Sequence, residues 1–449
     1  MQLAERTAEI ARLLQERNWR ALRELLAHLP PPEGAELLFR LQKPERMLVF
    51  RSMPRDLAAE VFTHLEPHDR DALLRDLTDE ETRQLLSSLS PDDRTHLLEE
   101  LPGNVTRRLL NLLSPEDLSV ARHLLGYPEE SVGRMMTPDY AAVRPDWTAA
   151  RALEHIRQLG KDTETINVVY VTARGGTLVG QVELRRFILA DPATPVDQIM
   201  DPNVISLSAH EDREKAVHTV ERYDVNVIPV VDSGGVLLGI VTVDDVLDVA
   251  EEEVTEDFHK IATVEPIHVP LREAGVGLFY QRRIGWLLVL VFVNVLSGAG
   301  IAYYQETIAR AITLVFFLPL LIASSGNAGA QSATLMVRGL ATGDVQGRDW
   351  LRLLGKELVV ATAIGLTMAA AVSLLGMYRA GAQVAVVVAV TMVAVVLVGS
   401  LIGLCLPLLL DRFGIDPAVA SAPLVTSIAD IAGVLVYFSF ASWYLGLPR

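Results

Sequence analysis

An acidic segment between residues 244 and 257 holds the densest set of side chains that could bind a cation. Eight of its 14 residues are acids and none is Lys or Arg: Asp244, Asp245, Asp248, Glu251, Glu252, Glu253, Glu256 and Asp257. On a helix, Asp245, Asp248, Glu252 and Glu256 share one face, where like charges repel. Because hard divalent cations prefer carboxylate oxygens, and Mg²⁺ keeps most of its waters there, the segment predicts a Mg²⁺ site. The alternative is a solvated acidic face.

A further carboxylate stands in an apolar context. Asp430 is the only charged residue between Pro417 and Pro448, and its insertion near the centre of a bilayer costs about 2.5 to 3.5 kcal/mol. The other long apolar runs contain no Lys or Arg that would pair with it. We therefore expect Asp430 to face water and a cation, the alternative being a neutral, hydrogen-bonded carboxyl group.

A small and polar segment interrupts another apolar run. It follows Pro319 and reads Ala-Ser-Ser-Gly-Asn-Ala-Gly-Ala-Gln over residues 323–331. Glycine and serine at this depth allow backbones to approach closely, or a helix to unwind against a cavity. A tight helix-packing seam is the alternative interpretation.

The charge of the 449-residue chain divides unevenly between its two parts. Residues 273–449 carry 8 acids and 10 bases, and the remaining 48 acids and 30 bases give residues 1–272 a net charge of −18. An acidic soluble part thus precedes an apolar part, and the lack of a basic patch argues against nucleic-acid binding. The single cysteine excludes an intrachain disulfide and zinc sites built on several cysteines.

Five runs with at most one charge are long enough to cross a bilayer, which takes roughly 20 helical residues. They cover residues 284–304, 311–337, 358–378, 380–410 and 417–448. Basic residues gather before the first run and between the second and third. The positive-inside rule therefore predicts a cytoplasmic soluble part and a C-terminus outside. No apolar signal segment opens the chain.

Residues 1–127 predict a series of short helices. Prolines followed closely by an acid recur at intervals near multiples of twelve, a pattern typical of repeated helix starts, at Pro54, Pro67, Pro91 and Pro115. We expect an all-α superhelical stack of helical hairpins, an architecture that commonly provides interaction surfaces.

A pattern of strands and helices occurs twice from about residue 130. Met136-Thr-Pro138 and Met200-Asp-Pro202 start 64 residues apart, and each precedes a strand, a helix and a hairpin with a Gly-Gly turn. The duplication resembles a tandem pair of CBS domains, with the closer match in Gly239-Ile-Val-Thr-Val-Asp-Asp245. Such pairs commonly sense adenine nucleotides or ions. The resemblance thus makes Thr242 and Asp245 possible nucleotide ligands and ATP a possible cofactor.

The order of helical repeats, CBS pair, acidic segment and five apolar runs resembles the MgtE family of magnesium channels over essentially the whole chain. The matching motifs are Gly326-Asn-Ala-Gly329 with Gln331-Ser-Ala-Thr334, Asp416-Pro417, and Pro423-Leu-Val through Asp430. The resemblance implies a Mg²⁺-selective uptake channel rather than an enzyme, closed by intracellular Mg²⁺ at acidic domain interfaces. It also implies a homodimer surrounded by lipid in the prokaryotic inner membrane.

The resemblance extends to domains and site residues. The pore would hold Mg²⁺ at Asp430 and be lined by Pro319, Gly326, Asn327, Gly329 and Gln331, with the acidic segment as a plug. Predicted metal ligands beyond that segment are Asp430, Asp416, Glu60, Asp92, Asp93 and Asp224. The expected domains are residues 1–128 (superhelical repeats), 129–196 and 197–246 (α/β CBS copies), 247–272 (plug helix) and 273–449 (five-helix pore domain).

Two other functions stay open. A proton-coupled divalent cation transporter also needs an intramembrane carboxylate. A CBS-based membrane signalling or scaffold protein would use the helical repeats for partners and conduct no ions. The chain lacks the His-Glu-x-x-His pattern of a membrane zinc protease and the Gly-rich pattern of a P-loop pump.

Overall fold

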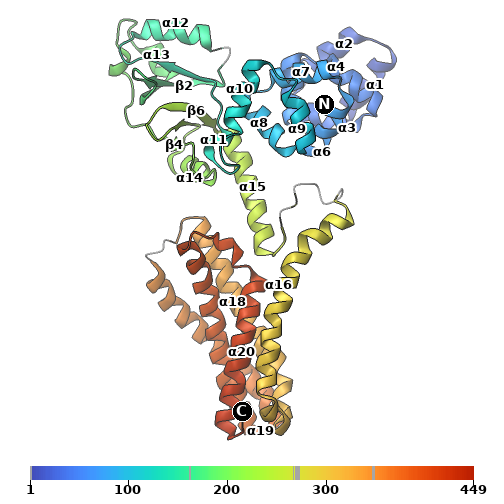
Figure 1. The fold of residues 1–449 in the computed structure, drawn as a ribbon, viewed down its shortest axis with the longest axis vertical. Coiled ribbons are helices and arrows are strands. Elements are labelled where there is room, and N and C mark those ends of the chain that lie inside the picture. Colours follow the sequence, from blue (N-terminus) through green and yellow to red (C-terminus); the bar gives the residue numbers. More distant parts are fainter. Residues whose placement is uncertain (1–2, 161–162, 266, 268–273, 346–348, 449) are drawn as a thin grey trace. The chain divides into compact units, whose positions relative to one another are not determined.

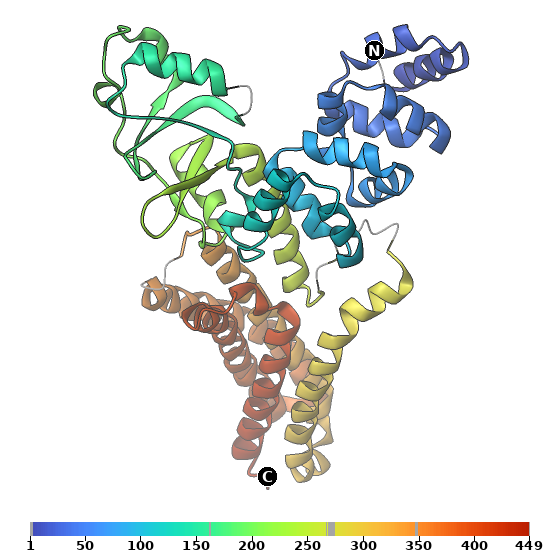
Figure 2. The ribbon, with the colours of Figure 1, turned by 45° about the horizontal axis from the view of Figure 1, so that its top comes forward.

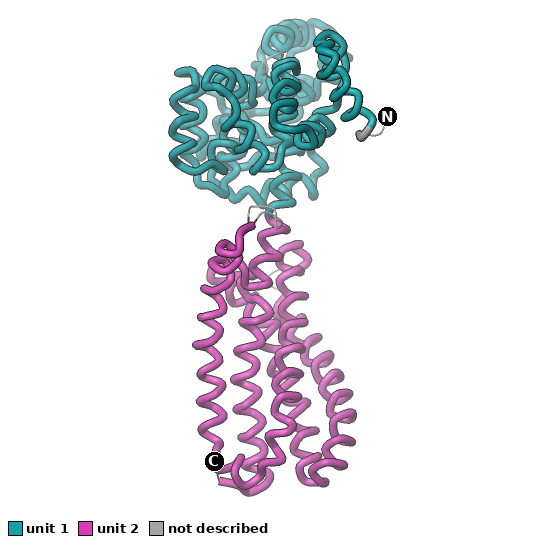
Figure 3. The backbone as a smooth tube through the Cα atoms, turned by 90° about the vertical axis from the view of Figure 1, so that its right-hand side faces the viewer, with its two compact units in different colours: residues 1–252 teal, residues 253–449 magenta. Residues whose placement is uncertain are grey.

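The computed structural model describes residues 3–160, 163–265, 267, 274–345 and 349–448. The chain forms two compact units, residues 1–252 and residues 253–449 (Figure 3). The boundary falls inside one helix, α15 (Val243–Ile261), which contributes residues to both units.

The described part of the first unit begins with ten short helices, nine of which repeat at a fixed interval (Figure 2). After α1 (Leu3–Gln15), nine helices begin twelve residues apart: α2 (Trp19–Leu26), α3 (Pro31–Arg40), α4 (Lys43–Ser52), α5 (Arg55–Thr63), α6 (Pro67–Asp76), α7 (Asp79–Ser88), α8 (Pro91–Glu100), α9 (Gly103–Leu110) and α10 (Pro115–Leu124). Helix α5 packs on α3 and α7, and α10 packs on α8. The predicted series of helix starts is confirmed, while the superhelical path of the array stays a prediction.

Pairs of buried apolar residues recur with the same interval. Each pair lies in the second half of its helix and is less than a tenth exposed: Leu37 and Leu38, Val49 and Phe50, Val61 and Phe62, Leu73 and Leu74, Leu85 and Leu86, Leu97 and Leu98. They form one continuous core. Proline fixes its φ near the helical value, and the N–H that it lacks would have no acceptor within the first turn of a helix. Many of these helices can therefore start with proline without losing a hydrogen bond.

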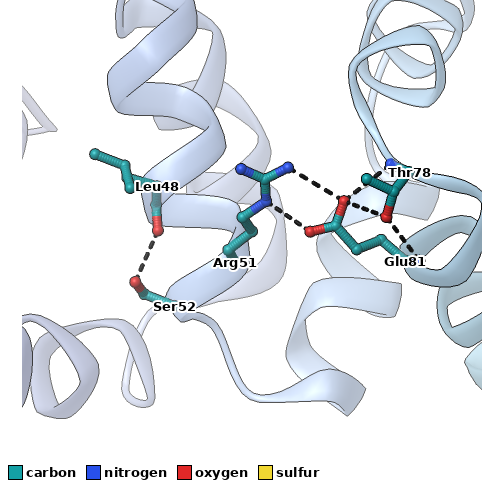
Figure 4. Close-up of polar contacts among 5 residues, drawn as sticks. All are labelled: Leu48, Arg51, Ser52, Thr78 and Glu81. Atoms are coloured by element: carbon teal, nitrogen blue, oxygen red, sulfur yellow. Dashed lines mark hydrogen bonds and ion pairs between the residues drawn. The ribbon is translucent and has the colours of Figure 1, made fainter.

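Ion pairs join helices of the array across a separation of 30 residues. Arg51 donates from Nε to Glu81 Oε1 at 2.6 Å, and the other oxygen of Glu81 accepts from the backbone N–H of Thr78 at 2.9 Å (Figure 4). Arg70 and Glu100 pair in the same way at 3.2 Å. Glu81 therefore both caps the start of α7 and ties it to α4.

The second part of this unit contains two three-stranded sheets of the same design. The first is β1 (Tyr140–Val143), β2 (Thr165–Thr172) and β3 (Leu178–Glu183), and the second is β4 (Leu207–Ser208), β5 (Val227–Val231) and β6 (Leu237–Thr242). In each sheet the first pairing is parallel and the second antiparallel. The accompanying helices are α11 (Val132–Met135), α12 (Ala149–Leu159), α13 (Leu184–Leu189) and α14 (Glu214–Tyr223). The predicted duplication is confirmed.

The second unit is a bundle of long apolar helices (Figure 1). Its main helices are α16 (Val276–Tyr303), α18 (Leu318–Ala341), α19 (Trp350–Arg412) and α20 (Ala422–Leu445), with short α17 (Gln305–Arg310), η2 (Ile312–Phe317) and η4 (Pro417–Val419) between them. Within the described residues, four helical elements are long and apolar enough to cross a membrane.

The longest of these elements is a helical hairpin. The 63-residue α19 loses helical geometry at Gly381, where φ is 82° and ψ is 172°. A Cβ atom added to Gly376 would lie 3.0 Å from the Cα atom of Ala385, and one on Gly365 would lie 3.0 Å from that of Val393. Since residues before and after Gly381 face each other in this order, the two halves run antiparallel. The predicted number of five spans requires each half to cross the membrane, and it stays a prediction.

Glu81 provides a test of the ion pairs in the helix array. We expect Glu81→Ala to cost about 1 kcal/mol, since it removes a cap and an ion pair, and to accelerate amide hydrogen exchange in α7 about fivefold at pH 7. The hydrogen bond from Arg51 lowers the pKa of Glu81 to about 2. The stabilisation is therefore present above the ordinary glutamate pKa of about 4.3, and is lost as pH falls from there towards 2.

Glu24→Ala is the matched control, because among the described residues the Glu24 carboxylate pairs only with Arg20, four residues away on an exposed helix face. Exchange in its helix should change less than twofold. Equal effects of the two variants on their own helices would contradict the role of Glu81.

Candidate divalent cation sites

The acidic segment forms the long helix α15, which starts directly after strand β6. Val246 and Val249 are buried, and Val246 belongs to the core of the second CBS copy. These contacts fix the rotation of the helix, so that its acids cannot all turn to solvent. The helix ends at Ile261 rather than continuing to residue 272 as predicted, and most of residues 266–273 lie outside the described part of the chain.

A cavity of about 90 Å³ collects acids from α8 and α15 within the first unit. Asp92, Asp93 and His96 come from α8, and Asp245, Asp248 and Glu252 come from α15. The remaining polar or charged lining residues come from the end of α8, the segment before α11, α11 itself and the N-cap of α14: Glu99, Glu129, Ser131, Arg134 and Arg213. Residues from helices some 150 positions apart thus meet at one concave site.

Asp92 is the most buried acid of this cavity. Its exposed fraction is 7 %, and its Oδ1 atom accepts no hydrogen bond within the described structure. Burial and the neighbouring Asp245 raise its pKa well above the ordinary value. A buried carboxylate without a donor is costly unless a proton or a cation compensates it.

Asp245 of α15 lines the same cavity as Asp92, and its carboxylate also lacks a positively charged partner among the described residues. Burial raises its pKa to about 7, the Asp244, Asp93 and Glu164 carboxylates add to the rise, and a 2.7 Å hydrogen bond donated by the Thr242 hydroxyl opposes it. Glu164, at the start of β2, also has a raised pKa because of burial and of Asp244 and Asp93. The electrostatics of the cavity therefore favour a cation.

Part of the negative charge is compensated by His96 and by two arginines that the sequence did not single out. Arg213 donates to Glu252 at 2.7 Å, Arg134 lies 3.6 Å from Glu99, and His96 lies 3.4 Å from Glu100. Within the described residues no three His, Cys, Asp or Glu side chains stand close enough together to hold one bare ion. A hydrated cation, which binds carboxylates through its waters, fits this spacing better than a dehydrated one.

The other predicted acids of this unit lie outside the cavity. Asp244, Glu251, Glu60 and Asp224 are exposed. Asp224 ends α14 in the left-handed conformation, with φ of 51°. Their metal-binding role stays a prediction.

Thr242 and Asp245 were predicted as possible nucleotide ligands. The Thr242 hydroxyl donates a hydrogen bond to the Asp245 carboxylate, and Asp245 lies in the acidic cavity beside Asp92. A phosphate group at this position would face several carboxylates, so the charge distribution disfavours it.

A second group of acids lies at the end of α15, in the membrane unit. Lys260 Nζ donates to Glu256 Oε1 and to Asp416 Oδ2, both at 2.6 Å. The other oxygen of Asp416 caps η4 by accepting the N–H of Ala418 at 2.8 Å. Burial and then Asp416 raise the pKa of the neighbouring Asp257. Asp416 is thus occupied by a lysine and a helix cap.

The polar glycine-rich segment forms part of a continuous helix, α18, so the suggestion that it unwinds is wrong. A Cβ atom on Gly326 would lie 2.7 Å from Thr426 of α20, and one on Gly329 would lie 2.8 Å from the carbonyl oxygen of Gly399. Only glycine permits these approaches, because an added methyl group would collide with the neighbouring helix. The alternative of a tight packing seam describes these two glycines.

Asp430 lies next to this seam. Its Oδ1 atom would be 3.5 Å from a Cβ atom on Gly326, and it accepts no hydrogen bond from the described residues. Asn327, Gln331 and Thr334 are exposed at helical spacings of four and three on α18, and Pro319 is exposed near its start. Amide and hydroxyl groups on the outside of an apolar helix need water or a partner helix. Their pore-lining role stays a prediction.

Three family models match this chain: the MgtE intracellular N domain over residues 29–130, the CBS domain over 132–192 and 196–252, and the divalent cation transporter domain MgtE over 318–440. The magnesium transporter MgtE of Thermus thermophilus is 40 % identical over 320 residues, which is 71 % of each chain. This chain belongs to the MgtE family. MgtE of Bacillus subtilis is 33 % identical over 72 % of this chain and 71 % of its own length.

Solved structures agree with the MgtE assignment for the first unit. The cytosolic domain of the Mg²⁺ channel MgtE, crystallised in complex with ATP, superposes with a TM-score of 0.52 at 38 % identity and covers 54 % of this chain and 99 % of its own. The soluble part of a magnesium transporter gives 0.54 at 28 % identity, over 56 % and 99 %. Members of the MgtE family are transporters or channels and not enzymes. By these matches, the chain has an N-terminal MgtE domain, a tandem CBS pair and a C-terminal helical region with candidate membrane spans.

Asp245→Asn tests the charge deficit of the cavity. The folded unit binds a proton at Asp245 more tightly than the unfolded chain, so its unfolding free energy falls as pH rises from about 4 to about 7. Asn keeps the acceptor for Thr242 and removes the charge. At pH 7.5 without divalent ions, we expect amide exchange in the first turns of α15 to be about tenfold slower in the variant, as about 1.4 kcal/mol would give.

The difference should shrink at pH 5, where Asp245 of the folded protein is protonated. Asp224→Asn, at an exposed helix end, serves as the control and should leave exchange unchanged. Faster exchange in Asp245→Asn at pH 7.5 would show that the carboxylate is already compensated.

Proposed function

We propose that the protein is a Mg²⁺-selective channel for magnesium uptake. The observation that carries the proposal is Asp430, a carboxylate without a partner among the described residues, beside the closely packed Gly326 of α18. A carboxylate at this depth is tolerated where it faces water or an ion. The family relatives named as magnesium transporters, and the solved structure named as a Mg²⁺ channel, support Mg²⁺ as the transported ion.

We propose that two chains form the pore together. The exposed stripe of Asn327, Gln331 and Thr334 is unsuited to lipid, and a second copy related by a two-fold axis would cover it or face it across water. With both halves of α19 crossing the bilayer there are five spans, an odd number, so that the N-terminal domains and the C-terminus lie on opposite sides. We propose that the N-terminal domains are cytoplasmic and the C-terminus is outside. The positive-inside distribution of the loops supports this topology in the inner membrane.

We propose that intracellular Mg²⁺ closes the channel through the acidic cavity. Hydrated ions between α8 and α15 would replace repulsion by attraction and stabilise one arrangement of Asp92, Asp245 and Asp248. Because a ligand shifts an equilibrium only by its differential affinity for the two states, a steep response needs several ions per chain. When Mg²⁺ falls, the uncompensated carboxylates separate and the channel opens.

The relative whose cytosolic domain was crystallised with ATP supports nucleotide binding by the corresponding first unit of this chain. We propose that the phosphates of such a nucleotide stay away from Thr242 and Asp245. The carboxylates of Asp92 and Asp93 in the same cavity repel them.

Asp430→Asn is the test of conduction. In proteoliposomes loaded with a Mg²⁺-sensitive dye, we expect uptake to fall at least about tenfold, because the amide lacks the charge that attracts the ion. The variant should still elute as a dimer. Asp411→Asn, an acid at the exposed end of α19, is the control and should conduct normally.

The same assay separates the alternatives. Uptake by the unchanged protein that collapses when a protonophore removes the proton gradient would support a proton-coupled transporter. No uptake at all would support a signalling or scaffold protein. Normal uptake by Asp430→Asn would refute the pore site.

Neutralising the acidic face of α15 tests the gate. Asp245→Asn, Asp248→Asn, Glu252→Gln and Glu256→Gln combined should leave the channel open at a cytosolic Mg²⁺ concentration that closes the unchanged protein. The first three changes remove carboxylates that line the cavity, and the fourth removes the partner of Lys260 at the end of the same helix face. Channel currents in reconstituted membranes, with Mg²⁺ varied on the cytosolic side, provide the measurement.

The matched control is Glu251→Gln combined with Glu253→Gln, which removes charge from the same helix outside the cavity lining. It should shift closure much less. If the quadruple variant closes with unchanged Mg²⁺ dependence, α15 is a solvated linker and the sensor lies elsewhere.

A further inference from the structure

Lys260 occupies an unusual position among the acids of α15. It is the first Lys or Arg after a run of eight carboxylates and lies in the last turn of the helix, where a positive charge is favourable. Its Nζ atom contacts one carboxylate of its own helix, Glu256, and one that is 156 residues away, Asp416, at 2.6 Å in each case. The helix alone would explain the first contact but not the second.

The three side chains are only partly exposed to solvent. The exposed fractions are 28 % for Lys260, 22 % for Glu256 and 38 % for Asp416. Asp257 is a third carboxyl group near this ammonium: burial and then Asp416 raise its pKa, and Lys260 opposes the rise. One ammonium group thus neutralises part of a group of three carboxylates, which would repel one another without it.

Asp416 connects this group to the helix that bears the proposed pore residue. Its Oδ1 atom caps η4, and α20 begins at Ala422, after the N-cap residue Ser421. Asp430 lies eight residues further along α20. An interaction that holds Asp416 therefore also holds the approach to α20. Asp257 and Lys260 lie at the other end of the connection, in the helix that the proposed gate uses.

We propose that Lys260 is a positioning residue for the gate: its ammonium group is a built-in counter-cation that holds the end of α15 against the segment leading into α20. This inference rests on the proposed function, since it assigns Lys260 a part in closure. The bond between Lys260 and Asp416 contributes to the closed arrangement independently of free Mg²⁺. It thereby lowers the amount of Mg²⁺ that closure needs.

The test is Lys260→Met, measured as channel current against cytosolic Mg²⁺ in full-length protein. Methionine keeps the length and apolar stem of the side chain and removes the charge. We expect the Mg²⁺ concentration for half-closure to rise about threefold, the effect of a partly exposed ion pair, while the current of the open channel stays the same. Lys260→Arg keeps the charge and should restore the original value.

Asp416→Asn identifies the partner. Asn retains the acceptor that caps η4 and loses the charge, so half-closure should again need more Mg²⁺. Combined with Lys260→Met it should cause no larger shift than Asp416→Asn alone, because both changes remove one interaction. Lys356→Met, an exposed lysine of the same unit, is the control and should leave closure unchanged.

The outcomes are distinguishable. If the unchanged protein passes no Mg²⁺, the proposed function fails. If it conducts and closes normally but Lys260→Met closes at the same Mg²⁺ concentration, or if the two shifts simply add, the role of Lys260 is refuted. Should Lys260→Met fail to elute as a dimer, Lys260→Gln replaces it in the same series.

Discussion

Asp92 and Asp245 approach each other at a site where neither is fully hydrated, and burial is the first cause of the raised pKa of both carboxyl groups. Holding them there costs free energy that the surrounding fold must supply. The helix array supplies it through the buried apolar pairs that recur from α3 to α8, and the second CBS copy anchors α15 through Val246. The cavity is therefore a strained charge distribution maintained by ordinary apolar packing.

The chain handles its acids differently at three places. In the cavity of the first unit, arginines pair with the outer acids Glu252 and Glu99, while Asp92 keeps an unsatisfied oxygen. At the end of α15, Asp416 has its counter-ion in a side chain of the same protein, Lys260. In the membrane unit, Asp430 has neither among the described residues. Sites that already contain a cation respond weakly to free ions, whereas sites without one depend on ions from solution.

The sequence predicted the structural elements that recur along the chain or that follow the period of a single helix. The helix starts of the array, the duplicated sheets and the acidic face of α15 all depend on local patterns, and the structure contains them. The prolines are spaced by approximately multiples of twelve residues, whereas the helices α2 to α10 start at intervals of twelve residues without exception. The reason is that each helix starts at a proline or at the corresponding position of its repeat.

What the sequence could not predict depends on contacts between distant segments. Arg134 and Arg213 reach the cavity only because α8 packs near the CBS pair, and no spacing indicates it. Glu164 does not line the cavity, but its charge contributes to the raised pKa of Asp245. The 156-residue separation hides the bond between Lys260 and Asp416 for the same reason. The glycines of α18 were open to two interpretations, and the position of Gly399 on another helix decides between them.

The fixed interval of the helix array also restricts how the chain can change in length. Helices two places apart in the array pack on each other, so successive helices alternate between its two sides. A pair of helices, 24 residues, can therefore be gained or lost without moving the following helices to the opposite side. Such a pair added before α2 would leave the register of α8 intact. A single added helix just before α8 would turn Asp92 to the opposite side. Insertions and deletions tolerated by this domain should therefore come in whole helical pairs, upstream of the helix that carries the buried acid.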